Sequence, residues 1–188
     1  VSGWSSIAAA PLDASRSVLC LMILISGSFD GLHETFWWLG KIGINPLEFP
    51  GRSAVVWSSS LGLLCANILG VSVYGLAIWV GLVQVRQFGN VQNIRFMDAF
   101  NTFALAILPI ALGYHFAHYL ISFLVQVQYL TATIADPLAG GRNLFGLGRS
   151  TVTVGFLNSL ESVRPILLTK VFAIILSHIL SVIMAHRL

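Results

Sequence analysis

The sequence predicts an all-α integral membrane protein: a helical bundle of about four transmembrane helices, with one interfacial segment and one long glycine-rich loop. Composition is the first observation, because 56% of the 188 residues are hydrophobic, only 9% are charged, and the mean hydropathy is +0.86. A soluble domain carries roughly 25% charged residues, so this chain lacks the polar surface that keeps such a domain dissolved. The second observation is that four apolar stretches reach the roughly 20 residues that a spanning helix needs.

The first expected span covers residues 11–29, with Pro11 at the first helical position, and we expect it to end where the glycines and the aspartate of residues 27–31 weaken the helix. Residues 32–52 are too interrupted to span, and the pair Trp37-Trp38 indicates an interfacial segment with an aromatic belt. The second span, 54–85, is long enough to tilt or protrude. A short polar turn, 86–95, follows it.

The third expected span is 97–125, with an extension to Ile134 as an alternative, and Pro109 is expected to kink it. The loop 136–159 is rich in glycine, and loops of this length are usually functional or contact a partner. The fourth span is 162–186. An even number of spans places both ends of the chain on one side of the membrane.

The distribution of basic residues gives little information on orientation. The chain holds ten Lys and Arg residues and a formal charge of +3, spread too thinly for a polybasic or nucleic-acid-binding patch. One side would carry Arg16, Arg86, Arg95 and Arg187, and the other Lys41, Arg52, Arg142, Arg149 and Arg164. We favour a cytoplasmic location for the first group, because the short 86–95 turn flanks two spans closely.

Two spans carry stripes of small residues, which let helices approach closely in a bilayer. The stripe recurs at every fourth position in the second and fourth spans: Ser58, Gly62, Ala66, Gly70 and Ala173, Ser177, Ser181, Ala185. These stripes suit packing within the chain or docking to another subunit. The cysteines, Cys20 and Cys65, lie in apolar segments and are interpreted as small buried hydrophobic residues.

Ionisable groups at membrane depth are costly and are usually functional or paired. Asp30, His33 and Glu34 cluster at the end of the first span, and His115 lies three residues before His118 in the third. His118 and His178 each lie 16 residues, roughly 24 Å, from the loop that joins their helices, so they are expected at similar depth. They are candidate ligands of haem b, another tetrapyrrole or a metal. The alternatives are interhelical hydrogen bonds and a proton or ion path.

Four stretches resemble the C-terminal part of a bacterial family of polytopic membrane proteins labelled fenitrothion hydrolase, or its membrane subunit. They are Phe29-Asp30-Gly31; Leu108-Pro109-Ile110-Ala111-Leu112 with Ala117-His118-Tyr119; Asp136-Pro137-Leu138 with Asn143-Leu144-Phe145-Gly146; and His178 with Ala185-His186. The matching polar residues are Asp30, His118, Asp136, His178 and His186. The resemblance implies a bacterial cytoplasmic (inner) membrane location. Members of this family carry further spans, so the resemblance also implies one of two arrangements. Either a separate chain supplies those spans, or this chain is a reduced relative that acts as an accessory subunit.

The chain contains no Gly-x-Ser-x-Gly, Walker A, His-Glu-x-x-His or Cys-x-x-Cys motif. The sequence therefore favours a non-catalytic accessory or structural subunit of a larger bacterial membrane protein complex, with the lipid bilayer and partner subunits as its surroundings and no nucleic acid. The competing hypothesis is a haem-, tetrapyrrole- or metal-binding subunit of a membrane redox or hydrolytic enzyme. A transporter is a third hypothesis, which four spans without an inverted repeat disfavour.

Overall fold

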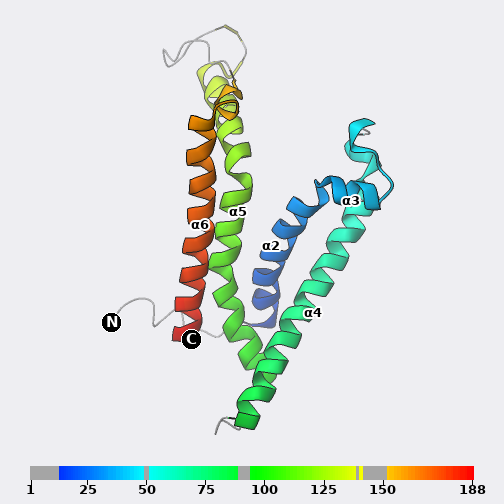
Figure 1. Cartoon of the computed structure of the whole chain (residues 1–188), viewed down its shortest axis with the longest axis vertical. Coiled ribbons are helices and arrows are strands. Elements are labelled where there is room, and N and C mark those ends of the chain that lie inside the picture. Colours follow the sequence, from blue (N-terminus) through cyan, green and yellow to red (C-terminus); the bar gives the residue numbers. More distant parts are fainter. Residues whose placement is uncertain (1–12, 49–50, 89–93, 139, 142–151) are drawn as a thin grey trace. The chain divides into compact units, whose positions relative to one another are not determined.

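The structure is a computed structural model that describes residues 13–48, 51–88, 94–138, 140–141 and 152–188. These residues form helices and turns without a strand: α2 (Ala14–His33), α3 (Phe36–Lys41), η1 (Pro46–Glu48), η2 (Arg52–Ala54), α4 (Val56–Phe88), α5 (Phe96–Ala135), η3 (Gly155–Leu157) and α6 (Leu160–Arg187). The predicted all-α class is confirmed. Four of these helices, α2, α4, α5 and α6, are long and apolar enough to cross a membrane (Figure 1). The chain is a polytopic membrane protein.

The first spanning helix differs from its expected bounds at both ends. The Asp13 carboxylate caps it by accepting the Arg16 backbone N–H at 2.8 Å, so the helix begins at Ala14, and Pro11 lies outside the described residues. At the other end the helix continues four residues beyond Phe29, to His33. The glycines do not end it because the packing of the buried Phe29 against Trp38 overrides their weak helix propensity.

The long helices α4, α5 and α6 also extend past their expected bounds. The largest difference is in α5, which continues from Val125 to Ala135 and holds Pro109 inside one helix. Residues 126–135 include polar side chains, which a hydropathy argument places beyond the membrane, but their helix propensity is intact. At 1.5 Å per residue the 40 residues of α5 extend about 60 Å, roughly twice the thickness of the hydrocarbon core.

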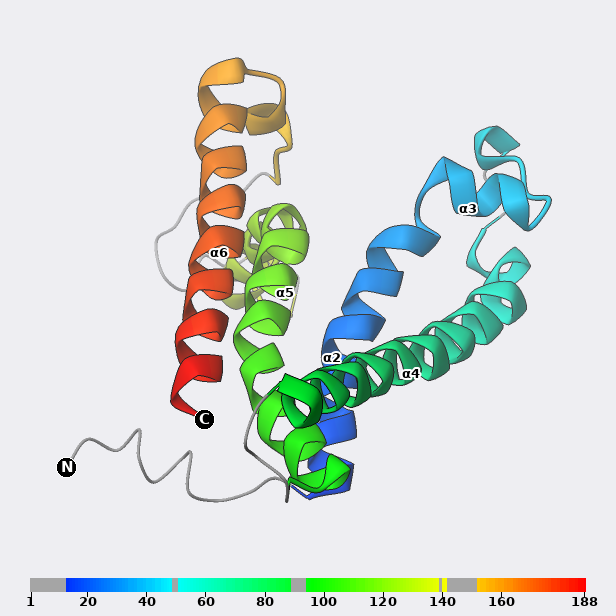
Figure 2. The same cartoon turned by 60° about the horizontal axis from the view of Figure 1, so that its bottom comes forward.

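The chain divides into two compact units. Unit 1 comprises Val1–Tyr114 and Leu176–Leu188, and unit 2 comprises His115–Ile175. In unit 1, α2 packs against α4, and the short elements α3, η1 and η2 connect them at one end (Figures 1 and 2). In unit 2, the second half of α5 returns through the loop and η3 into the first half of α6.

Single polar contacts join the helices of unit 1. Ser26 of α2 is 3.2 Å from the Asn67 side-chain amide of α4, and the Tyr74 hydroxyl donates to the Phe100 carbonyl of α5 at 2.8 Å. The Ser17 hydroxyl lies 2.8 Å from the Asn101 side-chain oxygen, and Ser181 of α6 donates to the Ala106 carbonyl. Helices in lipid associate by close packing and such hydrogen bonds, because burial of apolar side chains gives little advantage there. The core of unit 1 is accordingly rich in alanine, including the fully buried Ala104 and Ala111.

Candidate functional site

An aromatic corner forms where α2 ends against α3 and α4. The Phe29 and Trp38 rings meet edge to face, with centroids 5.2 Å apart and an interplanar angle of 84°, and the His33 ring stacks on Phe29 at 5.9 Å. Thr35 positions Trp38 by capping α3, since its hydroxyl accepts the Trp38 backbone N–H at 3.3 Å. We call Phe29, Asp30, His33, Trp38 and Gly62 the α2–α3 corner.

Gly62 allows α4 to approach the two rings. A Cβ atom at this position would lie 2.6 Å from Cη2 of Trp38 and 2.7 Å from Cζ of Phe29. Two turns later, Gly70 approaches Ile25 of α2 in the same way. Both glycines belong to the small-residue stripe of the second span, and this face of α4 lies against α2 and α3.

The polar part of the corner is a histidine with a carboxylate one turn before it. The Nδ1 of His33 lies 2.6 Å from the Asp30 carbonyl oxygen and 3.7 Å from the Asp30 carboxylate. A carbonyl only accepts, so Nδ1 carries the proton and Nε2 carries the lone pair. Both side chains are partly exposed, at 27% for His33 and 35% for Asp30.

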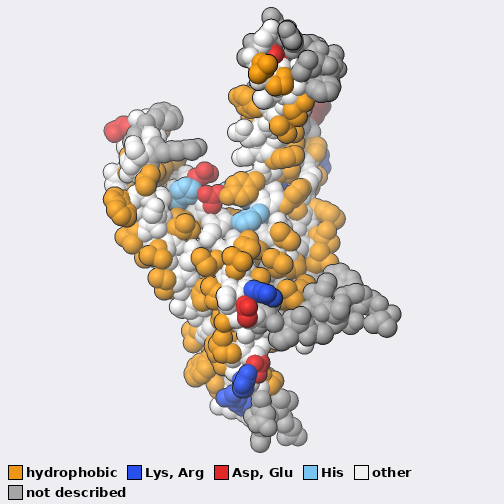
Figure 3. All heavy atoms as spheres, turned by 180° about the vertical axis from the view of Figure 1, so that it is seen from behind, with side chains coloured by type: hydrophobic (Ala, Val, Ile, Leu, Met, Phe, Trp, Pro, Cys, Tyr) orange, Lys and Arg blue, Asp and Glu red, His pale blue; other side chains and the backbone are white. Residues whose placement is uncertain are grey.

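The corner also buries two polar atoms that have no hydrogen-bond partner within the described part of the chain: the indole Nε1 of Trp38 and the hydroxyl of Ser59. Ser59 lies one turn before Gly62, on a neighbouring part of the same face of α4. Acidic and histidine side chains gather at the surface of this end of unit 1, above helices covered mainly by hydrophobic side chains (Figure 3). No group of three or more His, Cys, Asp or Glu residues able to hold a metal ion occurs among the described residues.

The histidines proposed as ligands fall in different compact units. His118, half-buried, belongs to unit 2, and its ring meets Tyr119 edge to face at 4.7 Å. His178 belongs to unit 1 and is exposed. His186 is exposed near the end of α6, and its Nδ1 lies 3.0 Å from the Val182 carbonyl. Haem or tetrapyrrole binding by His118 and His178 stays a prediction.

Asp136 has a structural role in the loop that follows α5. Its two carboxylate oxygens accept the backbone N–H groups of Gly140 at 2.9 Å and Gly141 at 2.7 Å. Gly141 has a φ of 74°, which a residue with a Cβ atom rarely adopts, so the glycine allows this turn. Nearby, the Gln128 side chain donates to the Thr153 carbonyl at 3.0 Å and accepts the Thr153 N–H at 2.9 Å, which ties the returning loop to α5. The second half of the loop motif, from Asn143 to Gly146, lies outside the described residues.

The fourth-span stripe is buried in part. Ser177 is 5% exposed and Ser181 7%, and the Ser181 hydroxyl bonds the α5 backbone within unit 1. Ala185 is half-buried in the same unit, and Ala173 is half-buried in unit 2. Cys65 is exposed on α4 and Cys20 is intermediate, so the expectation that both cysteines are buried is wrong in this chain. Most apolar side chains of α4, like Cys65, face the surroundings of the chain and not a core of its own.

Sequence reasoning missed two exposed stripes on the second half of α5. One is polar and comprises Ser122, Gln126, Tyr129 and Thr133, all exposed. The other is apolar and comprises Phe123, Val127, Leu130 and Ile134, of which all but Val127 are exposed. Both follow the alternating spacing of four and three residues that places side chains along one helix face. The signal was present in the sequence as this spacing, once the helix was extended beyond Val125.

Comparisons with protein-family models, with curated proteins and with solved structures found no match.

Proposed function

We propose that this chain is a non-catalytic subunit of a larger membrane protein complex and that the second half of α5 is the surface that contacts its partner. The observation that carries the proposal is the pair of parallel stripes on residues 122–134, one polar and one apolar, both exposed. This surface differs from that of α4. Only 6% of the most apolar 18-residue stretch of α4 is buried, and its exposed side chains suit lipid.

Neither lipid nor water alone suits both stripes. If residues 122–134 lie in hydrocarbon, the Gln126 amide and the Ser122 hydroxyl face lipid, where polar groups without partners are costly. If the same residues extend beyond the hydrocarbon, as the length of about 60 Å for α5 allows, Phe123 and Leu130 face water at 60% and 56% exposure. A helix of a second membrane protein satisfies both stripes at once, with hydrogen bonds along one and packing along the other.

The resemblance to the family labelled fenitrothion hydrolase supports the same proposal. Members of that family are polytopic bacterial membrane proteins, so we propose the bacterial inner membrane as the location of this chain. The resemblance offers no catalytic residue to carry over to this chain. A subunit role therefore fits the chain better than hydrolysis.

Photo-crosslinking in intact membranes tests the proposal. A photoreactive amino acid replaces Phe123 or Leu130 on α5, and the matched control replaces Leu69 of α4, which is 66% exposed. We expect a discrete protein adduct from each α5 position and adducts with lipid alone from Leu69. A native gel in mild detergent should show the chain in a complex that the substitution Leu130→Glu disrupts. A homogeneous monomer of 20.4 kDa, with only lipid adducts from α5, would contradict the proposal.

A further inference from the structure

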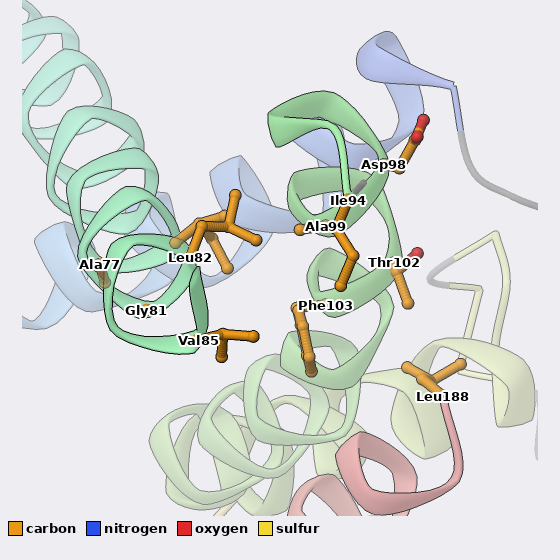
Figure 4. Close-up of a pocket in the computed structure, with 11 residues that line it drawn as sticks. Ala77, Gly81, Leu82, Val85, Ile94, Asp98, Ala99, Thr102, Phe103 and Leu188 are labelled. Atoms are coloured by element: carbon orange, nitrogen blue, oxygen red, sulfur yellow. The ribbon is translucent and has the colours of Figure 1, made fainter. Parts of the chain in front are cut away.

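An apolar cleft of about 550 Å³ opens in unit 1 between the last turns of α4 and the first turns of α5 (Figure 4). Figure 4 shows Leu82 and Val85 reaching from α4 toward α5, while Phe103 lines the facing side and Asp98 points away from α4. The volume falls in the usual range for sites that hold small molecules, about 300–1,000 Å³. Gly81 widens the cleft, because a Cβ atom there would have no neighbour within 4 Å.

The cleft extends from the end of a spanning helix toward the middle of that helix. Ala77, its innermost residue on α4, lies 11 residues before Phe88, which is about 16 Å along the helix axis. A molecule in the cleft would therefore have one end at the headgroup level and the rest among hydrocarbon. This position suits a lipid acyl chain rather than a water-soluble ligand.

A positive charge lies next to the lining of the cleft. The Arg86 guanidinium donates to the carbonyl of Ile94, a lining residue, at 3.0 Å, and within the described part of the chain it forms no ion pair with a carboxylate. The one carboxylate of the lining, that of Asp98, is neutralised by two hydrogen bonds from Arg95, at 3.1 and 3.2 Å. These bonds, and the negative charge of Asp98, raise the pKa of the Arg95 guanidinium.

The same end of unit 1 is basic overall. Four helix ends lie there: the start of α2, the end of α4, the start of α5 and the end of α6. Together they carry four arginines and two aspartates: Arg16, Arg86, Arg95, Arg187, Asp13 and Asp98. The opposite end of unit 1, from the end of α2 to η2, carries Asp30, Glu34 and Glu48 against Lys41 and Arg52. Anionic headgroups are attracted to the basic end.

We infer that this cleft holds an acyl chain of an anionic phospholipid, whose phosphate binds the Arg86 guanidinium. Arginine suits this role because its planar fork donates two parallel hydrogen bonds to phosphate oxygens. The site is independent of the α5 surface proposed to contact a partner. The cleft makes the basic end of unit 1 a binding site for anionic phospholipids.

Native mass spectrometry of the full chain, delipidated in detergent and titrated with phosphatidylglycerol or phosphatidylcholine, tests the inference. We expect one phosphatidylglycerol to be retained about fivefold more tightly than phosphatidylcholine, since one arginine near a lipid headgroup contributes a factor of that order. Arg86→Gln should abolish the preference. Lys41→Gln, at the opposite end of unit 1 and outside the cleft, should preserve it.

Filling the cleft tests the acyl-chain part separately. Gly81→Phe and Ala77→Phe should each remove the retained lipid, while Leu76→Phe, on α4 but outside the lining, should retain it. Far-UV circular dichroism checks that each variant keeps its helix content. Equal retention of both lipids, or retention that persists in both cleft-filling variants, would overturn the inference. A protein adduct in place of a lipid adduct from a photoreactive residue at position 77 would also overturn it.

Discussion

The close approach of α4 to the α2–α3 corner predicts that Gly62→Ala destabilises the protein. The new Cβ atom would lie 2.6 Å from Cη2 of Trp38, which is 0.8 Å less than the 3.4 Å at which ordinary contact begins. It would also lie 2.7 Å from Cζ of Phe29. The two rings are locked edge to face and Phe29 is 6% exposed, so neither can turn away without moving the other or displacing a helix.

The expected magnitude follows from comparing two glycines on the same helix. Overpacking a tight contact costs about 1–3 kcal/mol, while replacing a helical glycine by alanine gains up to about 1 kcal/mol of helix propensity. Gly81→Ala receives the gain without the clash, because the open position has no neighbour within 4 Å. The difference in unfolding free energy between the two variants should therefore be about 1–3 kcal/mol, with Gly62→Ala the less stable.

Unfolding in mixed micelles, driven by increasing SDS and followed by far-UV circular dichroism, measures this difference. Gly70→Ala is the intermediate control, because its new Cβ atom meets one aliphatic side chain, Ile25, with Cδ1 at 2.5 Å and Cγ1 at 2.7 Å, instead of two aromatic rings. We expect the midpoints to rise in the order Gly62→Ala, Gly70→Ala, Gly81→Ala. A Gly62→Ala midpoint at or above that of Gly81→Ala would refute the packing of α4 on the α2–α3 corner.

Three further predictions concern polar contacts. Asn67→Leu removes the hydrogen bond to Ser26 and should lower the unfolding free energy by roughly 0.6–2 kcal/mol in the same assay, whereas no change would mean that the pair is not formed. Asp136→Ala removes the acceptor of two loop amides, so hydrogen exchange at Gly140 and Gly141 should accelerate while exchange within α5 stays unchanged. If the protein binds haem, its absorption spectrum contains a Soret band that His178→Ala removes; a colourless wild-type protein would end the haem hypothesis.

The helical class and the number of long apolar helices could be predicted from the sequence because both depend on local composition and length. Helix ends were less predictable. The glycines of residues 27–31 weaken α2. Phe29, which lies within that stretch, contacts His33 and Trp38, and these contacts keep α2 helical to His33. Only the folded chain shows that Gly62 faces Trp38, since the two residues belong to different elements.

The candidate site illustrates the same limit. Asp30 and His33 were recognisable as neighbours on one helix face because they are three residues apart. The structural role of Asp136 could not be predicted, because its partners are backbone N–H groups whose positions depend on the positive φ of Gly141. The cleft beside Arg86 requires α4 and α5 to lie together, an arrangement that no short sequence pattern encodes.

Cysteine accessibility in sealed membrane vesicles tests the central claim, that four helices cross the bilayer. Single cysteines at Gln87, Lys41 and Asn158, in a chain without Cys20 and Cys65, report the three connections between the spans. An impermeant thiol reagent should label Lys41→Cys and Asn158→Cys from one side and Gln87→Cys only from the other. Labelling of all three positions from the same side, or recovery of the protein in the soluble fraction without detergent, would contradict it.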